Sequence, residues 1–245
     1  MSIWGKIIGG TAGFALGGPL GAILGVMAGN IFDRSKKTSF NYKNISNQQK
    51  QSIFALSIII LGAKLAKADG IVTNDEIAAF KEKFKISSTD MQEVGKIFNE
   101  AKKSTYGFEN IANQVGNLFQ DNRIVLEELL NNLFYIAEAD GKISDDELIF
   151  LKTVSSIFKF DENTFQRIYQ TRLNDITSDP YKVLGVKRED SDETIRKTWI
   201  KLTKEHHPDH LISKGMPPEF IEQATNEMSS INSAYDKIQK IRKNN

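Results

Sequence analysis

The chain has 245 residues, with 32 lysines and arginines against 31 aspartates and glutamates and a formal net charge of +1. This balance excludes the global basic field on which nonspecific nucleic-acid binders depend, so any basic partner surface must be local. The absence of cysteine excludes disulfides, thiolate zinc sites and a cysteine nucleophile. The length suits two small domains better than one large domain.

An uncharged, largely apolar segment runs from residue 7 to residue 32, which is long enough to cross a bilayer as a helix. Glycine recurs at every fourth position, a pattern that lets two membrane helices approach closely. We therefore predict a transmembrane anchor over residues 1–32 and a homodimer that forms through its glycine stripe. The stripe consists of Gly9, Gly13, Gly17, Gly21, Gly25 and Gly29.

Two other interpretations of this segment stay open. A cleaved signal peptide would have only Lys6 in its basic region and an unusually long apolar run. The glycines and Pro19 also fit a segment that lies on the membrane surface without inserting. For a spanning helix, the positive-inside rule places the rest of the chain in the cytoplasm, at a bacterial inner membrane. The basic residues of the juxtamembrane linker, residues 33–50, are Arg34, Lys36, Lys37 and Lys43.

Residues 51–175 are predicted to form an all-helical domain, because residues 46–174 contain no proline and apolar residues recur three and four positions apart. One apolar stripe begins at Ile53. The predicted core residues of the first stripe are Ile53, Leu56, Ile60 and Leu61, and those of a second stripe are Leu126, Leu129, Leu130, Leu133, Phe134 and Ile136.

The same domain contains an internal repeat, because residues 66–76 align with residues 137–147 at a constant offset of 71. In each copy an Asp-Gly turn precedes a hydroxyl residue, which is followed three positions later by glutamate. This spacing is typical of a capping box at the start of a helix. The two copies therefore predict two related helix-turn-helix units.

The Asp-Gly turns also raise the question of a calcium loop. In that register the first ligand position would be Leu65 or Ile136, so an EF-hand is disfavoured. The paired turns resemble the tellurite-resistance TerB domain, and this resemblance implies an acidic surface that binds a metal ion or a protein. Helix capping and solvation account for the same residues without a ligand, and no metal or cofactor is assigned. The acidic patch would contain Asp69, Asp75, Glu76, Asp140, Asp145, Asp146 and Glu147.

A second domain is predicted over residues 178–245, because Pro180 disfavours helix before it and suits the first turn of a new one. After a short helix stopped by Gly185, an amphipathic helix capped by Ser191 or Asp192 follows. Its apolar face carries Ile195, Trp199 and Leu202. Its outer face is basic and carries Arg196, Lys197, Lys201 and Lys204.

This basic helix must end near His206, because Pro208 cannot continue it. We expect a loop that runs to Pro218 and then a long helix with apolar residues three and four apart. Two long helices joined by such a loop should pack antiparallel, with the loop at one tip. The side chains expected to be exposed there are His207, Pro208 and Asp209.

The order of motifs resembles a J domain over residues 178–242: Tyr-x-Val-Leu-Gly-Val at residues 181–186, the basic helix, His-Pro-Asp, and Ile-Asn-x-Ala-Tyr at residues 231–235. Residues 4–9 and 205–219 extend the resemblance to a family of DnaJ-like membrane proteins. One departure is Thr198-Trp199, where J domains usually have Ala-Tyr. A Gly/Phe-rich linker and a cysteine-rich module are also missing, so independent binding of unfolded clients is not supported.

The resemblance implies a co-chaperone rather than an enzyme. His207, Pro208 and Asp209 would engage the nucleotide-binding domain and interdomain linker of a DnaK-type chaperone, while the basic helix docks electrostatically. ATP hydrolysis would occur in the partner, and the membrane anchor would recruit that partner to the inner membrane. The alternative is an envelope stress sensor or scaffold led by the TerB-like domain, with the J module secondary.

Other classes have less support. A metal site made of His206, His207 and His210 would sit on a loop with no evident second shell. The basic helix has no base-stacking aromatic platform beside it, so we expect no nucleic-acid partner. An enzyme would need a phosphate loop or a nucleophile with its base, and the sequence contains neither pattern.

Overall fold

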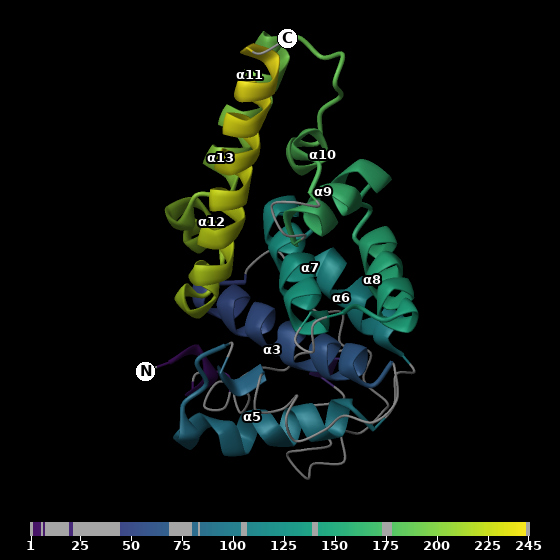
Figure 1. The fold of residues 1–245 in the computed structure, drawn as a ribbon. Helices are drawn as coiled ribbons and strands as arrows, with labels where there is room; N and C mark the ends of the chain where they lie inside the picture. Colours follow the sequence, from purple (N-terminus) through teal and green to yellow (C-terminus); the bar gives the residue numbers. More distant parts are fainter. Residues whose placement is uncertain are drawn as a thin grey trace.

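The computed structural model describes residues 2–5, 7, 20–21, 45–68, 80–82, 84–103, 107–138, 142–172 and 178–243. Within these residues the regular structure is entirely helical, which confirms the all-α prediction (Figure 1). The bundle helices are α3 (Asn47–Ala66), α5 (Ser88–Ala101), α6 (Phe108–Leu118), α7 (Arg123–Ala137), α8 (Asp145–Ile157) and α9 (Glu162–Arg172). The C-terminal helices are α10 (Pro180–Leu184), α11 (Asp192–Glu205), α12 (Pro208–Lys214), the 3-10 helix η2 (Pro218–Phe220) and α13 (Ile221–Lys243).

Helix α3 is the centre of the bundle. It lies between α5 on one side and α6, α7 and α8 on the other (Figure 1). Every residue from Ser52 to Leu65 is buried, because the helix is apolar around most of its circumference. The predicted core residues Ile53, Leu56, Ile60 and Leu61 are all buried, and the buried surface of the helix extends beyond them. The helix starts at a capping box in which Ser46 and Gln49 bond to each other's backbone amides.

The internal repeat is visible where the structure describes both copies. Helices α3 and α7 end at Ala66 and Ala137, which are equivalent in the repeat, and they pack against each other. In the second copy, the predicted capping box is present at the start of α8, where Ser144 accepts from the Glu147 amide and the Glu147 carboxylate accepts from the Ser144 amide. The equivalent box of the first copy lies outside the described residues.

The predicted helical hairpin is confirmed by α11 and α13, which lie side by side (Figure 1). Trp199 stacks on Tyr235, with ring centroids 4.4 Å apart, and donates from Nε1 to Asn232 at 2.8 Å. The unusual tryptophan is therefore accommodated with its polar atom satisfied. At the far end, Arg242 donates to the carbonyls of Arg188 and Asp190, which ties α13 to the start of α11.

The segment between α11 and α13 is more ordered than the expected loop. Helix α11 ends at Glu205, as expected, but Pro208 begins α12. Proline suits the first position of a helix, where its missing N–H has no intrahelical partner. Gly215 then ends α12 with φ of 106°, a conformation that favours glycine.

This segment packs on the bundle. Leu211, Met216 and Phe220 are fully buried and belong to the bundle core. Phe220 lies between three other rings, with centroid distances of 5.6 Å to Trp4, 5.1 Å to Phe54 and 5.3 Å to Phe84. The outer half of the hairpin has a separate core that includes Tyr181, Leu184, Ile195, Ile231 and Ile238.

Little of the predicted anchor is described. Ile3, Trp4, Ile7 and Leu20 are buried, and the Ile3 amide donates to Glu219 at 2.7 Å. In the described parts of the chain, no helix combines the length and apolar character needed to cross a membrane. Of the glycine stripe, only Gly21 lies within those parts, so the predicted stripe is otherwise outside the described residues.

Candidate chaperone-binding surface and interdomain cluster

The His-Pro-Asp turn is held by the start of α12. His207 is the N-cap, and its Nδ1 accepts from the Asp209 amide at 3.2 Å. Pro208 follows as the first helical residue. The His207 side chain is 54% exposed and that of Asp209 is 91% exposed. The turn therefore presents an imidazole and a carboxylate to solvent from a backbone fixed by a helix start.

The predicted basic face lies on α11, directly before this turn. Ser191 caps the helix by accepting from the Thr194 amide, and Ile195 and Leu202 face the core. The basic residues are all exposed: Arg196, Lys197, Lys201 and Lys204. Their intrahelical ion pairs, Lys197 with Glu193 at 2.6 Å and Lys201 with Glu205 at 4.0 Å, are on the surface. Such surface pairs contribute little to stability, so the two lysines can exchange them for ion pairs with a partner protein.

A buried polar cluster joins the two domains beside this surface. We call it the interdomain cluster. The bundle contributes residues from α7 and α9, and the J-like hairpin contributes the residue that caps α11 and one residue of α13. Its members are Glu127, Glu128, Asn131, Arg167, Arg172, His206 and Glu227.

His206 is at the centre of the interdomain cluster and has no exposed surface. Its Nδ1 lies 2.9 Å from Glu128 Oε1 and 3.8 Å from Glu227 Oε2, and its Nε2 lies 3.2 Å from Glu127 Oε1. Both ring nitrogens therefore face carboxyl oxygens. Since His206 directly precedes His207, the cluster fixes the backbone at the point where the His-Pro-Asp turn begins.

Two arginines balance the carboxylates. Arg167 pairs with Glu127 and, at 3.2 Å, with Glu227. Arg172 donates to the side chain and backbone of Asn131, each at 3.0 Å, and the Asn131 amide donates to Glu227. Of these contacts, those of Arg167 and Asn131 with Glu227 cross from the bundle to the hairpin, and the Glu227 side chain is buried.

The pKa values of two buried carboxyls of the cluster, Glu128 and Glu227, are shifted in opposite directions. Burial, and then the charge of Glu227, raises the pKa of Glu128. Burial also acts to raise the pKa of Glu227, but the charges of His206, Arg167 and Arg172 outweigh it and lower that pKa overall. Of these two carboxyls, Glu128 therefore holds a proton more readily than Glu227.

The cluster also has the donor set of a cation site. Glu127, His206 and Glu227 each offer one ligand atom, and these atoms lie within 4.8 Å of one another. Arg167, however, already pairs with both carboxylates, so a metal ion would have to displace a buried guanidinium. The geometry therefore favours an ion-pair network.

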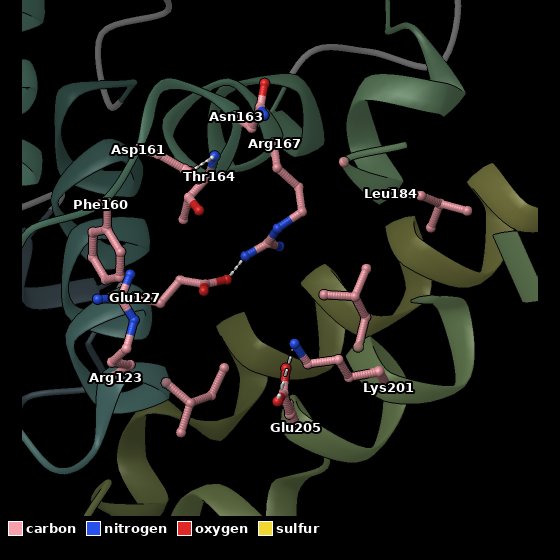
Figure 2. A pocket seen from close by; sticks show the side chains of 13 residues that line it. Arg123, Glu127, Phe160, Asp161, Asn163, Thr164, Arg167, Leu184, Lys201 and Glu205 are labelled. Atoms are coloured by element: carbon pink, nitrogen blue, oxygen red, sulfur yellow. Dashed lines mark hydrogen bonds and ion pairs between the residues drawn. The ribbon is translucent and has the colours of Figure 1, made fainter. Parts of the chain in front are cut away.

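A cavity of about 430 Å³ opens next to the cluster, between the two domains (Figure 2). On the bundle side Arg123 lies over the Phe160 ring, 5.0 Å from its centroid. On the hairpin side Lys201 points toward Glu205 (Figure 2). The cavity therefore borders the basic face of α11, and Glu127 and Arg167 line its inner wall.

The other predicted site residues are placed only in part. The three histidines are not equivalent: His206 is buried, His207 is exposed and His210 is half-buried on α12. In the acidic patch, Asp145 and Asp146 are exposed at the start of α8, whereas Glu147 is buried in the capping box. The remaining patch residues, Asp69, Asp75, Glu76 and Asp140, lie outside the described residues.

Sequence reasoning missed the interdomain cluster. Glu127 and Glu128 lie between Leu126 and Leu129 in α7, but helical spacing places Glu128 on the face opposite the predicted core stripe. A charged residue on that face is expected to be exposed, and its burial depends on a partner from elsewhere in the chain. The sequence could not tell which domain supplies that partner.

Three family models match the chain. They are the co-chaperone DjlA transmembrane domain over residues 1–48, the tellurite resistance protein TerB over residues 55–170 and the DnaJ domain over residues 179–244. No solved structure matches the chain significantly. The DnaJ match covers the hairpin that carries the exposed His-Pro-Asp turn. The chain is therefore a J-domain protein.

Curated relatives match along nearly the whole chain. The Co-chaperone protein DjlA of Coxiella burnetii is 29% identical, and the match covers 97% of each chain. The proteins of the same name from Photobacterium profundum and Escherichia coli K12 are 26% and 24% identical, over 97% of this chain and 98% and 97% of theirs. The three matches in this order, together with these relatives, support a DjlA-type protein.

Proposed function

We propose that this co-chaperone stimulates ATP hydrolysis by a DnaK-type chaperone and recruits it to the bacterial inner membrane. The observation that carries the proposal is the exposure of His207 and Asp209 at the start of α12, directly beside the basic face of α11. The J domain implies the DnaK-type partner, and the match to the DjlA transmembrane domain supports membrane association.

The two parts of this surface have different tasks. Exposed cations on α11 attract an acidic partner surface, which speeds encounter and sets orientation. The few side chains of the His-Pro-Asp turn then supply the specific contact, as a small number of residues usually does in an interface. ATP is bound and hydrolysed in the chaperone, so this chain needs no catalytic base of its own.

Membrane topology and self-association belong to the same proposal. The basic residues after the apolar segment favour an orientation with the TerB and J domains in the cytoplasm. The glycine repeat favours a homodimer through the anchor. Together these features would hold J domains close to the inner face of the membrane, where they raise the local concentration of recruited chaperone.

Recruitment can be tested by flotation of liposomes that contain the full chain, mixed with a DnaK-type chaperone and ATP. We expect the chaperone to float with the liposomes, and Asp209→Asn to reduce that amount by about tenfold or more, because it alters a central contact. The matched control is Asp236→Asn, an exposed position on α13, which should have no effect. Equal flotation with Asp209→Asn, or none with the unaltered chain, would contradict the proposal.

The alternative role, a stress sensor or scaffold led by the TerB domain, depends on the acidic patch. Its described exposed members are Asp145 and Asp146. In cells, a double Asn variant of these residues that loses function while His207→Gln keeps it would favour this alternative. The reverse pattern would favour the co-chaperone mechanism.

A further inference from the structure

The segment that follows the His-Pro-Asp turn packs its apolar side chains on the bundle. Leu211 of α12 and Met216 after it are fully buried, yet both belong to the bundle core and not to the core of the hairpin. Two side chains of α3 hold the backbone of the same segment: Asn47 donates to the Ile212 carbonyl at 3.3 Å, and Gln51 donates to the Met216 carbonyl at 3.4 Å.

Contacts between buried charged and polar groups of the cluster cross from one domain to the other. Arg167 of the bundle pairs with Glu227 of the hairpin at 3.2 Å. Glu128 of the bundle lies 2.9 Å from His206 Nδ1, and burial raises the pKa of Glu128. These groups have their partners only when both domains are in place, and an unpaired buried charge is costly.

We propose that Glu128 of the TerB bundle is a positioning residue for chaperone stimulation: by holding His206, it keeps the adjacent His-Pro-Asp turn in the geometry that the chaperone recognises. This inference rests on the proposed function. Glu128 is itself fully buried, so it does not contact the chaperone directly. Its effect is on the fraction of chains whose turn is ready to bind, and a smaller ready fraction weakens apparent affinity in proportion.

The first test is a titration of the full chain, in detergent micelles, against a DnaK-type chaperone in steady-state ATP turnover. Glu128→Ala should raise the concentration for half-maximal stimulation about tenfold and leave the maximal rate unchanged, since contacting residues couple with about this strength. Glu128→Gln should stay close to the unaltered chain, because a side-chain amide of the same size can keep a hydrogen bond to His206 Nδ1. A smaller folded fraction would raise the half-maximal concentration in the same way, so the folded fraction of each variant is measured by circular dichroism and used to correct the titration.

The matched control is Glu93→Ala on α5, where the glutamate makes only a surface pair with Lys96. It should change neither the maximal rate nor the half-maximal concentration. Equal half-maximal concentrations for Glu128→Ala and the unaltered chain would overturn the positioning role. So would a loss of maximal rate that Glu128→Gln shares.

A second test does not depend on ATP turnover. The chain has no cysteine, so Ser156→Cys on α8 and Ser229→Cys on α13 give one spin label in each domain. We expect a narrow distance distribution that Glu128→Ala broadens and Glu128→Gln leaves narrow. An equally narrow distribution with Glu128→Ala would overturn the positioning role. If the unaltered chain fails to stimulate the chaperone, the proposed function fails, and these distances still decide whether Glu128 fixes the hairpin.

Discussion

Replacing Phe220 with alanine is expected to lower the free energy of unfolding by about 3 to 5 kcal/mol, the usual cost of removing a buried ring. Phe220 is fully buried and contacts the rings of Trp4, Phe54 and Phe84, which belong to three separate segments. The cavity left behind would lie where the hairpin joins the bundle. Both units should therefore lose stability together.

The measurement is denaturant unfolding of the full chain in detergent micelles, followed by tryptophan fluorescence. The two tryptophans report on different places, because Trp4 contacts Phe220 and Trp199 lies within the hairpin. Ile149→Ala is the control: this side chain is 63% exposed, and its loss should change stability by less than about 0.5 kcal/mol. A Phe220→Ala effect as small as that of the control would show that the ring does not join the domains.

Replacing Arg167 with methionine is expected to cost about 3 to 5 kcal/mol at neutral pH, because it leaves buried carboxylates without their partner. Arg167 is only 5% exposed and pairs with Glu127 and Glu227. Methionine fills a similar volume, so the loss reports mainly on charge. Arg123→Met is the control, since that arginine is exposed and contacts Phe160 and the Lys159 carbonyl, and it should cost less than about 1 kcal/mol.

The pH dependence of the Arg167→Met effect follows from Glu227. The pKa of Glu227 is lowered in the folded chain, where burial is outweighed by His206, Arg167 and Arg172. A lowered carboxyl pKa contributes stability above the ordinary value, and this contribution is lost as the pH falls through the folded-state value. Loss of Arg167 raises the folded-state pKa of Glu227, so the difference between Arg167→Met and the unaltered chain should be largest at neutral pH and shrink as the pH falls through the pKa of Glu227 in the variant. A difference that is constant with pH would contradict this assignment.

The hairpin was the part of the fold that the sequence predicted most fully. Apolar spacing on the basic helix identified Ile195 and Leu202 as buried residues, and Pro208 located the end of that helix. Helix α12 was missed because proline was interpreted only as a stop signal. With His207 as N-cap and Gly215 after the last turn, the same proline begins a new helix.

The site was predictable only where it faces solvent. His207, Asp209 and the cations of α11 follow local patterns that hold whatever the hairpin packs against. The cluster around His206 depends instead on which face of the hairpin meets the bundle, and neither periodicity nor capping encodes that docking. The sequence therefore offers His206 only as a candidate metal ligand, whereas in the structure its Nδ1 hydrogen-bonds with Glu128 Oε1.

The central claim, that the exposed turn drives the ATP turnover of a chaperone, is tested most directly by steady-state hydrolysis of ATP by a DnaK-type chaperone with and without the full chain. We predict stimulation by the unaltered chain, loss of stimulation with His207→Gln, and normal stimulation with His210→Gln, a half-buried histidine three residues away. Absence of stimulation by the folded, unaltered chain toward a chaperone that responds to another J protein would contradict the claim. Undiminished stimulation by His207→Gln would contradict it as well.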